Sequence, residues 1–229
     1  MNIVIHGCGG RMGRILTEMI FEENEHKVLC GIDIECIGDL PYPIYRDFTF
    51  VTKKVDVVID FSNPTAIKGL LGWCILHGTP VVIATTGLGP EEHRIIQEAA
   101  KQIPIFQSAN MSLGINALCK AISLISSILC GEFETGIFEI HHKNKKDSPS
   151  GTAYLLEDSL KNCTAKITAL RIGAVPGEHT VYFAGSDEVL TLTHTAYSRK
   201  IFARGALRAA SFIIKSKPGL YCMNDLNDS

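Results

Sequence analysis

Short apolar stretches alternate with segments of helical periodicity through the first half of the chain. Five stretches are predicted to be strands, at residues 3–6, 28–33, 55–61, 80–85 and 103–107. Several are continuous apolar runs, as expected for a parallel sheet covered by helices on both faces. Helices are predicted between them at residues 11–23, 65–76 and 90–101. This order predicts an α/β fold built on a Rossmann-type, doubly wound parallel sheet.

The second half of the chain has a different pattern. Residues 113–129 are apolar on most sides of a predicted helix, which indicates burial between domains or subunits. Strands are predicted at residues 133–142, 166–172, 180–184 and 188–194, and a last helix at 204–215. The run at 189–193 alternates, which indicates a sheet with one covered face. We therefore expect a first domain at residues 1–111 and a smaller α+β domain at 112–198.

The composition argues against nucleic acids and membranes as binding partners. The chain has 229 residues, 46% hydrophobic and 20% charged, enough for one large domain or two small ones. The formal net charge of −2 argues against a nucleic-acid-binding surface. The longest apolar stretch, near residues 115–130, is interrupted by Lys120 and several serines, so no membrane span is expected.

The cysteines are scattered. They are Cys8, Cys30, Cys36, Cys74, Cys119, Cys130, Cys163 and Cys222. No C-x-x-C pair and no zinc-ligand spacing occurs, so we expect neither a metal site nor a disulfide framework. Because an apolar strand follows almost directly on Met1, we expect no signal or transit peptide and a reducing cytoplasm as the compartment.

A glycine-rich turn follows the first predicted strand. It consists of Gly7, Cys8, Gly9, Gly10, Arg11, Met12 and Gly13. Met12 takes the place of the third glycine of G-x-G-x-x-G, but Gly7, Gly10 and Gly13 fit a G-x-x-G-x-x-G spacing. Glycines at such a turn let the backbone approach a pyrophosphate at the N-terminus of the next helix. The first domain is therefore predicted to bind a dinucleotide.

An acidic residue, Asp33, ends the second predicted strand. A carboxylate at this position accepts hydrogen bonds from the ribose hydroxyls of the adenosine, which favours NAD over NADP. The alternative interpretation is a solvated carboxylate at a strand end.

The densest chemistry lies at residues 139–153, EIHHKNKKDSPSGTA. The alternation before it predicts a strand that ends at His141 and His142, and a helix opens at Ser150-Gly151-Thr152. The first N–H groups of a helix suit a carboxylate or a phosphate. Together with three lysines, the imidazoles predict a site for a small, multiply negative substrate that becomes protonated. A solvated loop is the alternative interpretation.

The order of these residues resembles the signature of the dihydrodipicolinate reductase (4-hydroxy-tetrahydrodipicolinate reductase) family. That signature is close to E-x-HH-x-x-K-x-D-x-PSGTA, and the chain matches every fixed position. Residues 83–87 resemble the family's G-T-T-G loop, with Ala84 in place of the first glycine. Residues 108–114 resemble its A-N-x-S-x-G segment and 197–206 its S-R-x-x-F-x-x-G-A stretch. The resemblance spans nearly the whole chain.

The resemblance implies an NAD(P)H-dependent oxidoreductase of lysine and diaminopimelate biosynthesis that reduces a cyclic, unsaturated dicarboxylate. His141 is the candidate general acid, because an imidazole titrates near working pH. Lys145 would add positive charge beside the ring nitrogen or donate a proton. Substrate-binding candidates are His142, Ser150, Gly151, Thr152 and Arg199. A surface arginine is an equal alternative for Arg199, and Asp147 either orients a lysine or caps the turn.

The resemblance also implies which residues lie along the cofactor. Besides the glycine turn and Asp33 they are Ala84, Thr85, Thr86, Ser108, Ala109, Asn110 and Met111. Family members often carry an arginine for the 2′-phosphate where Ile34 follows Asp33, although Arg11 can face that phosphate. NADH is therefore favoured, with NADPH as the alternative. Family members complete the first domain with a segment like 199–229 and are typically homotetramers, so a homo-oligomer is expected.

Two rival functions fit parts of the pattern. One is another Rossmann-type reductase acting on a different small anion, because fold does not fix function. The other is a dinucleotide-sensing protein without catalysis, although the chain shows no basic recognition helix or repeat. The concentration of cations and imidazoles at residues 139–153 favours the reductase of a dianion over both.

Overall fold

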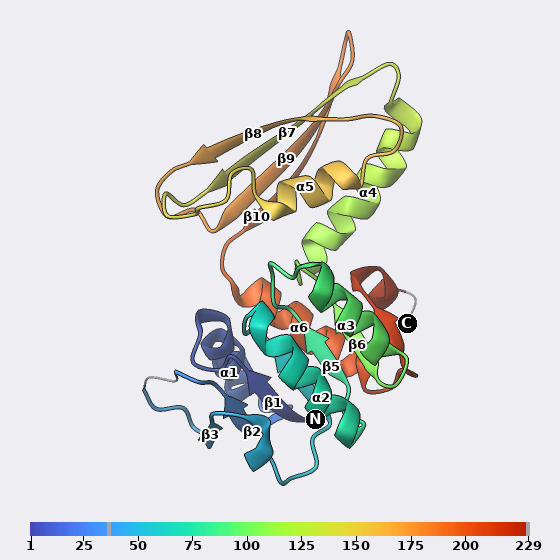
Figure 1. Ribbon diagram of the computed structural model, residues 1–229. Helices are drawn as coiled ribbons and strands as arrows, with labels where there is room; N and C mark the ends of the chain where they lie inside the picture. The colour runs from blue at the N-terminus through green and yellow to red at the C-terminus, as the bar shows by residue number, and fades with distance from the viewer. Residues whose placement is uncertain (36–37, 228–229) are drawn as a thin grey trace. The chain divides into compact units, whose positions relative to one another are not determined.

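The computed structural model describes residues 1–35 and 38–227, without the side chain of Asn227. It divides into two compact units (Figure 1). Unit 1 comprises Met1–Met111 and the described residues from Lys200 onward, and unit 2 comprises Ser112–Arg199. Cys36 lies outside the described residues.

Unit 1 contains a parallel sheet. Its strands are β1 (Asn2–His6), β2 (Lys27–Ile32), β3 (Ile44–Tyr45), β4 (Val57–Asp60), β5 (Val81–Ile83), β6 (Pro104–Gln107) and β11 (Gly219–Tyr221). The order is β11-β6-β5-β4-β1-β2-β3, and every pairing is parallel. The pattern of apolar residues did not predict β3 and β11, because strands of two or three residues are too short to show a periodicity.

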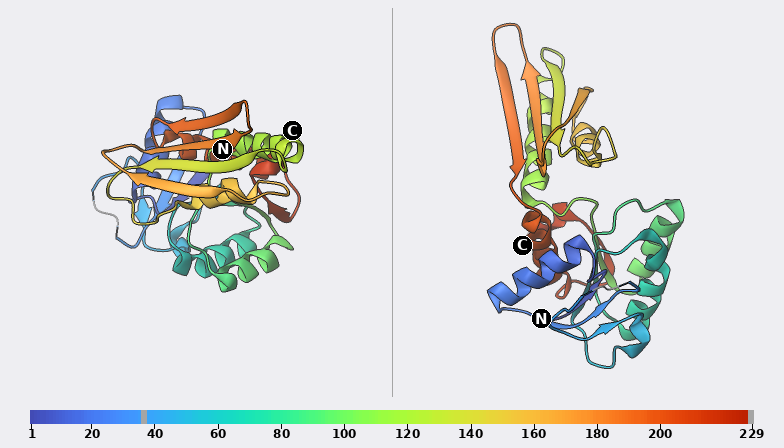
Figure 2. Two further views of the ribbon diagram at one scale, coloured as in Figure 1. Left: turned by 90° about the horizontal axis from the view of Figure 1, so that it is seen from above. Right: turned by 90° about the vertical axis from the view of Figure 1, so that its left-hand side faces the viewer.

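Helices cover both faces of this sheet. They are α1 (Arg11–Glu23), α2 (Ile67–His77), α3 (Pro90–Ala100) and α6 (Lys200–Ile213), with short 3₁₀ turns η1 (Phe48–Phe50), η2 (Pro64–Ala66) and η3 (Met223–Asn227). Helices α1 and α6 lie side by side on one face, and α2 and α3 on the other (Figure 2). Helix α6 begins at Lys200 rather than at the predicted 204, because no glycine or proline interrupts residues 200–204.

The central strands form the core of unit 1. All four residues of β4 are buried, and Val4, Ile83 and Ile105 are 0% exposed. Leu70, Leu71 and Ile96 from the helices pack against these strands. Burying apolar surface stabilises a fold by roughly 25 cal/mol per Å². The continuous apolar runs of the sequence therefore correspond to strands that are buried on both faces.

Unit 2 pairs two helices with a mixed sheet. Its elements are α4 (Leu113–Leu129), α5 (Gly151–Asp158), β7 (Glu134–His141), β8 (Lys166–Arg171), β9 (Gly177–Ala184) and β10 (Val189–Ala196). The strand order is β10-β9-β7-β8, in which only β7 and β8 are parallel. Residues of α4 and α5 pack with Ile137, Val181 and Phe183 on one face. The predicted fold class, a doubly wound sheet with a smaller α+β part, is confirmed.

One disulfide bond is present, although the cysteine spacing predicted no disulfide framework. Cys130, which follows α4, is bonded to Cys163, which precedes β8, with 5.8 Å between their Cα atoms. Their separation of 33 residues carries no spacing signal, so only the fold brings them together. Among the residues described, no helix combines the length and the apolar character needed to cross a bilayer.

Candidate active site

The glycine turn of unit 1 connects β1 to α1. Gly7 has φ +78°, and a Cβ there would lie 2.6 Å from the carbonyl oxygen of Phe61. A Cβ on Gly13 would lie 2.3 Å from the carbonyl oxygen of Gly7. Both positions therefore require glycine, and the turn packs backbone against backbone. Dinucleotide-binding turns use this arrangement to hold a pyrophosphate at a helix N-terminus.

A cavity of about 400 Å³ opens beside this turn. It is lined by His6, Gly7, Gly10, Ile32, Asp33, Ile34, Arg46, Phe61, Ser62, Asn63, Thr65 and Ala66. Most of these residues lie at or just after the carboxyl ends of parallel strands, where open α/β sheets bind ligands. The structure thus brings the predicted Gly7, Gly10 and Asp33 to one cavity. The side chain of Cys8 is fully buried, so only its backbone remains for a ligand.

Asp33 is held by the glycine turn. Its Oδ2 accepts a hydrogen bond from the Gly9 N–H at 2.8 Å. Its own N–H donates to the carbonyl of Tyr45 at 2.9 Å, so the end of β3 lies beside it. Arg46 follows β3 and lines the same cavity as Asp33. Sequence reasoning missed Arg46, because the pairing of β2 with β3, rather than adjacency in the chain, places it there.

A buried carboxylate, Asp60, ends β4. It is 0% exposed and accepts hydrogen bonds from Thr85 Oγ1 at 2.7 Å and Ser62 Oγ at 2.6 Å. His6 Nδ1 lies 2.8 Å away without hydrogen-bond geometry. The hydroxyl of Thr85, a predicted cofactor contact, is therefore committed to Asp60.

The two predicted nicotinamide segments lie together. Residues 84–86 follow β5 and residues 108–111 follow β6, its parallel neighbour. The Ser108 N–H donates to the carbonyl of Ile83 at 3.2 Å. Thr86 and Ala109 are exposed, whereas Ala84 and Met111 are buried.

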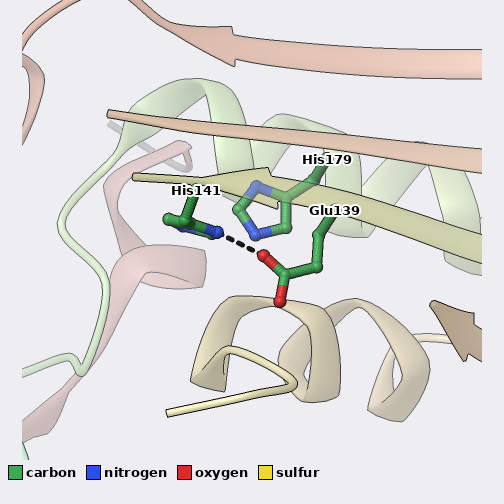
Figure 3. Close-up of side chains that lie close together, drawn as sticks. All are labelled: Glu139, His141 and His179. Carbon is green, nitrogen blue, oxygen red and sulfur yellow. Dashed lines mark hydrogen bonds and ion pairs between the residues drawn. The ribbon is translucent and has the colours of Figure 1, made fainter. Parts of the chain in front are cut away.

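Strand register assembles a cluster of polar side chains in unit 2. Glu139 and His141 lie two residues apart on β7 and therefore share a face. His179 on β9 is opposite Glu139, and Arg171 on β8 is opposite His141. Figure 3 shows Glu139 and His141 turned toward each other, with the His179 ring beside them.

The Glu139 carboxylate is the centre of this cluster and is 0% exposed. Its Oε2 accepts a hydrogen bond from His141 Nδ1. Its Oε1 accepts from a terminal guanidinium nitrogen of Arg171 at 2.7 Å and from the Ser150 N–H at 3.0 Å. His179 Nε2 lies 3.1 Å from Ser150 Oγ, and its ring meets that of His141 edge-on at 5.1 Å between centroids.

Burial and charge set the protonation states. Burial alone would raise the pKa of Glu139, but hydrogen bonds from Arg171 and His141 outweigh it and lower that pKa. Burial lowers the pKa of His141 against the opposing effect of Glu139. Burial, with a smaller contribution from His141, lowers the pKa of His179 to about 4. Near neutral pH the resting cluster therefore holds an ionised carboxylate and neutral imidazoles.

The lysine of the loop after β7 lies near this cluster. Lys145 Nζ is 2.9 Å from Asp147 Oδ2, and its charge contributes to lowering the pKa values of His141 and His179. Burial would raise the pKa of Asp147, but hydrogen bonds, first from Lys145 and also from the Gly151 backbone, lower it. Asp147 thus lies beside both the lysine and the start of α5, which combines the two roles considered for it.

At the start of α5, Ser150 is buried, whereas Gly151 and Thr152 are more exposed. Ser150 is the N-cap, is 1% exposed, and its Oγ accepts from the Ala153 N–H at 3.2 Å. The Ser150 N–H donates to Glu139, so both the N–H and the hydroxyl of Ser150 are engaged in hydrogen bonds within the protein. Gly151 is exposed and Thr152 half-buried in the first turn, and His142 is half-buried directly after β7, one residue beyond the observed end of the strand. A role of Ser150 in substrate binding stays a prediction.

Glu139, His141 and His179 also offer ligand atoms within 4.8 Å of one another, as a metal site requires. Each side chain has one hydrogen-bond partner in the protein, whereas the buried Nδ1 of His179 has none among the described residues. Arg199, predicted to bind substrate, ends unit 2. Within the described ranges, Arg199 makes no hydrogen bond or ion pair with the cluster.

Sequence reasoning identified His141, Lys145 and the helix start but assigned no role to Glu139, Arg171 or His179. The alternation of β7 already placed Glu139 on the face of His141, so a signal for it was present. Arg171 and His179 depend on strand register, which single-sequence patterns do not specify.

The chain matches two halves of one known protein family. Residues 1–111 match the family described as "Dihydrodipicolinate reductase, N-terminus", and residues 114–226 match "Dihydrodipicolinate reductase, C-terminus". The 4-hydroxy-tetrahydrodipicolinate reductase of Caldanaerobacter subterraneus subsp. tengcongensis is 42% identical, over 99% of this chain and 98% of its own. The protein of that name from Clostridium tetani is 38% identical, over 100% and 98%.

Solved structures share the fold. A dipicolinate-bound dihydrodipicolinate reductase from Paenisporosarcina sp. TG-14 superposes with a TM-score of 0.83 at 22% identity, covering 98% of each chain. Aspartate dehydrogenase from Thermotoga maritima gives a TM-score of 0.59 at 13% identity, covering 95% of this chain and 97% of its own. Likenesses at such identities establish the architecture alone.

Proposed function

The chain belongs to the dihydrodipicolinate reductase family, and from this premise we propose that it reduces 4-hydroxy-tetrahydrodipicolinate to tetrahydrodipicolinate with a nicotinamide cofactor, the hydroxyl group leaving as water. This is a step of lysine and diaminopimelate biosynthesis. The observation that supports the chemistry is the grouping of His141, Lys145 and the first turn of α5 around one buried carboxylate.

Unit 1 has the features that hold a dinucleotide. A nicotinamide cofactor, when bound, supplies the hydride. The glycine turn would bind its pyrophosphate, Asp33 its adenosine ribose, and residues 84–86 and 108–111 its nicotinamide half. The cavity of about 400 Å³ and the glycine positions closed to a Cβ support this fit.

Unit 2 supplies the proton and positive charge. His141 takes up a proton from solvent at Nε2 and then donates it as hydride adds to the substrate, because its ring is fixed by Glu139 through Nδ1 and keeps Nε2 for the substrate. When substrate binds, Lys145 leaves its ion pair with Asp147 and interacts with a carboxylate or the ring nitrogen of the substrate. His142 and the first turn of α5, Gly151 and Thr152, bind the other carboxylate through donors and the helix dipole.

Steady-state turnover tests this proposal. Nicotinamide absorbance should fall in the presence of freshly generated 4-hydroxy-tetrahydrodipicolinate. His141→Ala and Lys145→Ala should each lower kcat by roughly a hundred- to ten-thousandfold, because one acid–base group is lost. The affinity for NADH should not change, because these residues lie in unit 2.

Lys143→Ala is the matched control, since Lys143 is an exposed lysine of the same loop, and it should change kcat little. A folded, NADH-binding protein that shows no turnover would contradict the substrate assignment. Equal loss of NADH binding in both active-site variants would contradict their roles.

For the cofactor, we propose NADH as the preferred reductant with NADPH also used. The carboxylate of Asp33 suits free ribose hydroxyls and repels a 2′-phosphate. Arg46, which lines the same cavity, supplies a positive charge that offsets part of this repulsion.

We further propose that the protein is a homo-oligomer, a tetramer by family resemblance, assembled through the sheet of unit 2. Helices α4 and α5 cover the face that bears Ile137 and Val181. On the opposite face Leu170 is 42% and Tyr182 39% exposed. In sedimentation, Leu170→Asp with Tyr182→Glu should give a smaller species than wild type, whereas Tyr197→Glu, outside the strands, should not. Identical sedimentation of all three proteins would contradict this interface.

A reducing cytoplasm is the compartment we propose. Cys30, Cys74, Cys119 and Cys222 are free thiols. In that compartment Cys130 and Cys163 would be reduced as well. Rapid alkylation in intact cells should therefore label both cysteines, and their protection from alkylation would contradict the assignment.

A further inference from the structure

One carboxylate contacts both halves of the unit 2 site. Glu139 Oε2 accepts from the His141 ring, while Oε1 accepts from the Ser150 N–H that precedes α5. A single buried side chain thus fixes the distance between the proposed acid and the proposed anion-binding turn.

The charge of Glu139 has a dedicated partner. The Arg171 guanidinium donates to Oε1 at 2.7 Å and also to the Asp147 carbonyl at 2.7 Å. A buried carboxylate without a counter-charge would take up a proton, whereas this one is held ionised. An ionised carboxylate only accepts hydrogen bonds, so His141 must donate to it through Nδ1–H.

This donation specifies the tautomer of His141. With Nδ1 protonated and directed at Glu139, the neutral ring has its lone pair on Nε2, the nitrogen that exchanges the catalytic proton. Gly177 lies against that nitrogen: a Cβ there would be 3.0 Å from His141 Nε2. The absence of a side chain at 177 leaves the Nε2 edge of the ring uncrowded.

A second imidazole, that of His179, contacts both His141 and Ser150. His179 packs edge-on against His141 and bonds to Ser150 Oγ at 3.1 Å. Its low exposure, 4%, and the contact with Ser150 restrict both the ring of His141 and the helix start. The charged or titratable groups around His141 are therefore Glu139 on its own strand, Arg171 on β8, His179 on β9 and Lys145 in the loop.

From these contacts we infer that Glu139, held by Arg171, is a positioning residue of the reaction: it fixes the Nδ1–H tautomer of His141 and anchors the Ser150 start of α5. The inference rests on the proposed function of His141 as the acid. It assigns to Glu139 no contact with substrate.

Glu139→Gln tests the inference with a side chain of the same shape. The amide can still accept from Ser150, but it removes the negative charge that stabilises the protonated ring of His141. We expect kcat to fall about a hundredfold or more. Because protonated His141 becomes less favourable, the alkaline limb of the kcat profile should move to lower pH. The KM for the dicarboxylate should change much less than kcat.

Glu134→Gln is the matched control, since Glu134 is an exposed glutamate at the start of the same strand. It should leave kcat and the pH profile unchanged. Glu139→Asp keeps the negative charge on a shorter side chain. It should therefore move the alkaline limb of the kcat profile back toward its wild-type pH, even if kcat itself stays low. A Glu139→Gln protein with kcat within about threefold of wild type and an unmoved alkaline limb would overturn the inference.

Nitrogen-15 NMR of histidine-labelled protein provides a test independent of turnover. The His141 signals, assigned by their loss in His141→Gln, should report the Nδ1–H tautomer in wild type. An Nε2–H tautomer in wild type would overturn the inference even if Glu139→Gln fails to fold. Absent turnover with the Nδ1–H tautomer present would instead contradict only the proposed function.

Discussion

Asp33 and Arg46 oppose each other in charge at one cavity of unit 1. Asp33 is fixed by the Gly9 N–H and directly follows β2, while Arg46 is exposed just after β3. The fixed carboxylate of Asp33 should distinguish NADH from NADPH more strongly than the exposed Arg46 does, because the charge of an exposed side chain is screened by solvent. These two charges are the basis of the proposed preference for NADH, with NADPH also used.

Arg46→Ala should weaken NADPH binding roughly fivefold, the effect of one exposed ion pair. NADH binding should change less than twofold, because NADH carries no 2′-phosphate. Fluorescence titration of each cofactor measures both affinities. Arg94→Ala, an exposed arginine of α3, serves as the control. Equal weakening for both cofactors would show that Arg46 does not act on the 2′-phosphate.

Residue chemistry in this site was predictable where it is local in sequence. His141, Lys145 and the turn at Ser150 lie within one short segment whose order carries the signal. Arg171 and His179 reach the same carboxylate only through the pairing of β8 and β9 with β7. Those pairings depend on packing between distant segments, so no local pattern reveals them.

At the level of elements, Asp60 links three strand ends of unit 1. It ends β4, bonds Thr85 after β5 and lies beside His6 at the end of β1. Parallel strands end at one edge of a sheet, so a buried carboxylate there holds the loops that follow. Thr85 is in one of the loops proposed to bind the nicotinamide.

Asp60→Asn should destabilise unit 1 by roughly 2–4 kcal/mol, because an amide replaces an acceptor of several buried donors. It should also weaken NADH binding through the loop at Thr85. Thermal unfolding followed by Trp73 fluorescence measures the first effect, since this is the chain's single tryptophan and lies in unit 1. Glu98→Gln on the exposed face of α3 should leave the melting temperature unchanged. Unchanged melting of Asp60→Asn would show that the carboxylate is dispensable.

Elements were predictable in proportion to their length and periodicity. The buried strands β1, β4 and β5 appear in the sequence as continuous apolar runs, and α1 as a periodic segment after a glycine turn. The short strands β3 and β11 have no such pattern and form because a neighbouring strand offers free backbone groups. The Cys130–Cys163 bond likewise follows from tertiary proximity alone.

At the scale of the whole molecule, the chain leaves unit 1 after Met111 and returns to it at Lys200. Unit 2 is therefore inserted into a continuous first unit, and α6 and β11 complete the first sheet and its cover. The units carry different chemistry. The residues proposed to bind the cofactor lie in unit 1, and the titrating cluster lies in unit 2. Acid should accordingly act first on unit 2.

The stability of unit 2 should fall as the pH is lowered from about 6.5 to about 4. The pKa of His179 is lowered by burial from 6.5 to about 4 in the fold, and its buried Nδ1 has no hydrogen-bond partner among the described residues. Between these values the unfolded chain binds a proton that the folded chain does not, so protonation favours unfolding. The shift corresponds to at most about 3 kcal/mol.

Calorimetry across this pH range, with Trp73 fluorescence to identify the transition of unit 1, measures the effect. His179→Gln cannot titrate and should flatten the pH dependence of the unit 2 transition, although the lowered pKa of His141 leaves a residual slope. His93→Gln, at an exposed position of α3, should leave it intact. If His179→Gln kept the wild-type slope, the acid sensitivity would belong to other groups, with Glu139 contributing only at lower pH because its pKa is itself lowered.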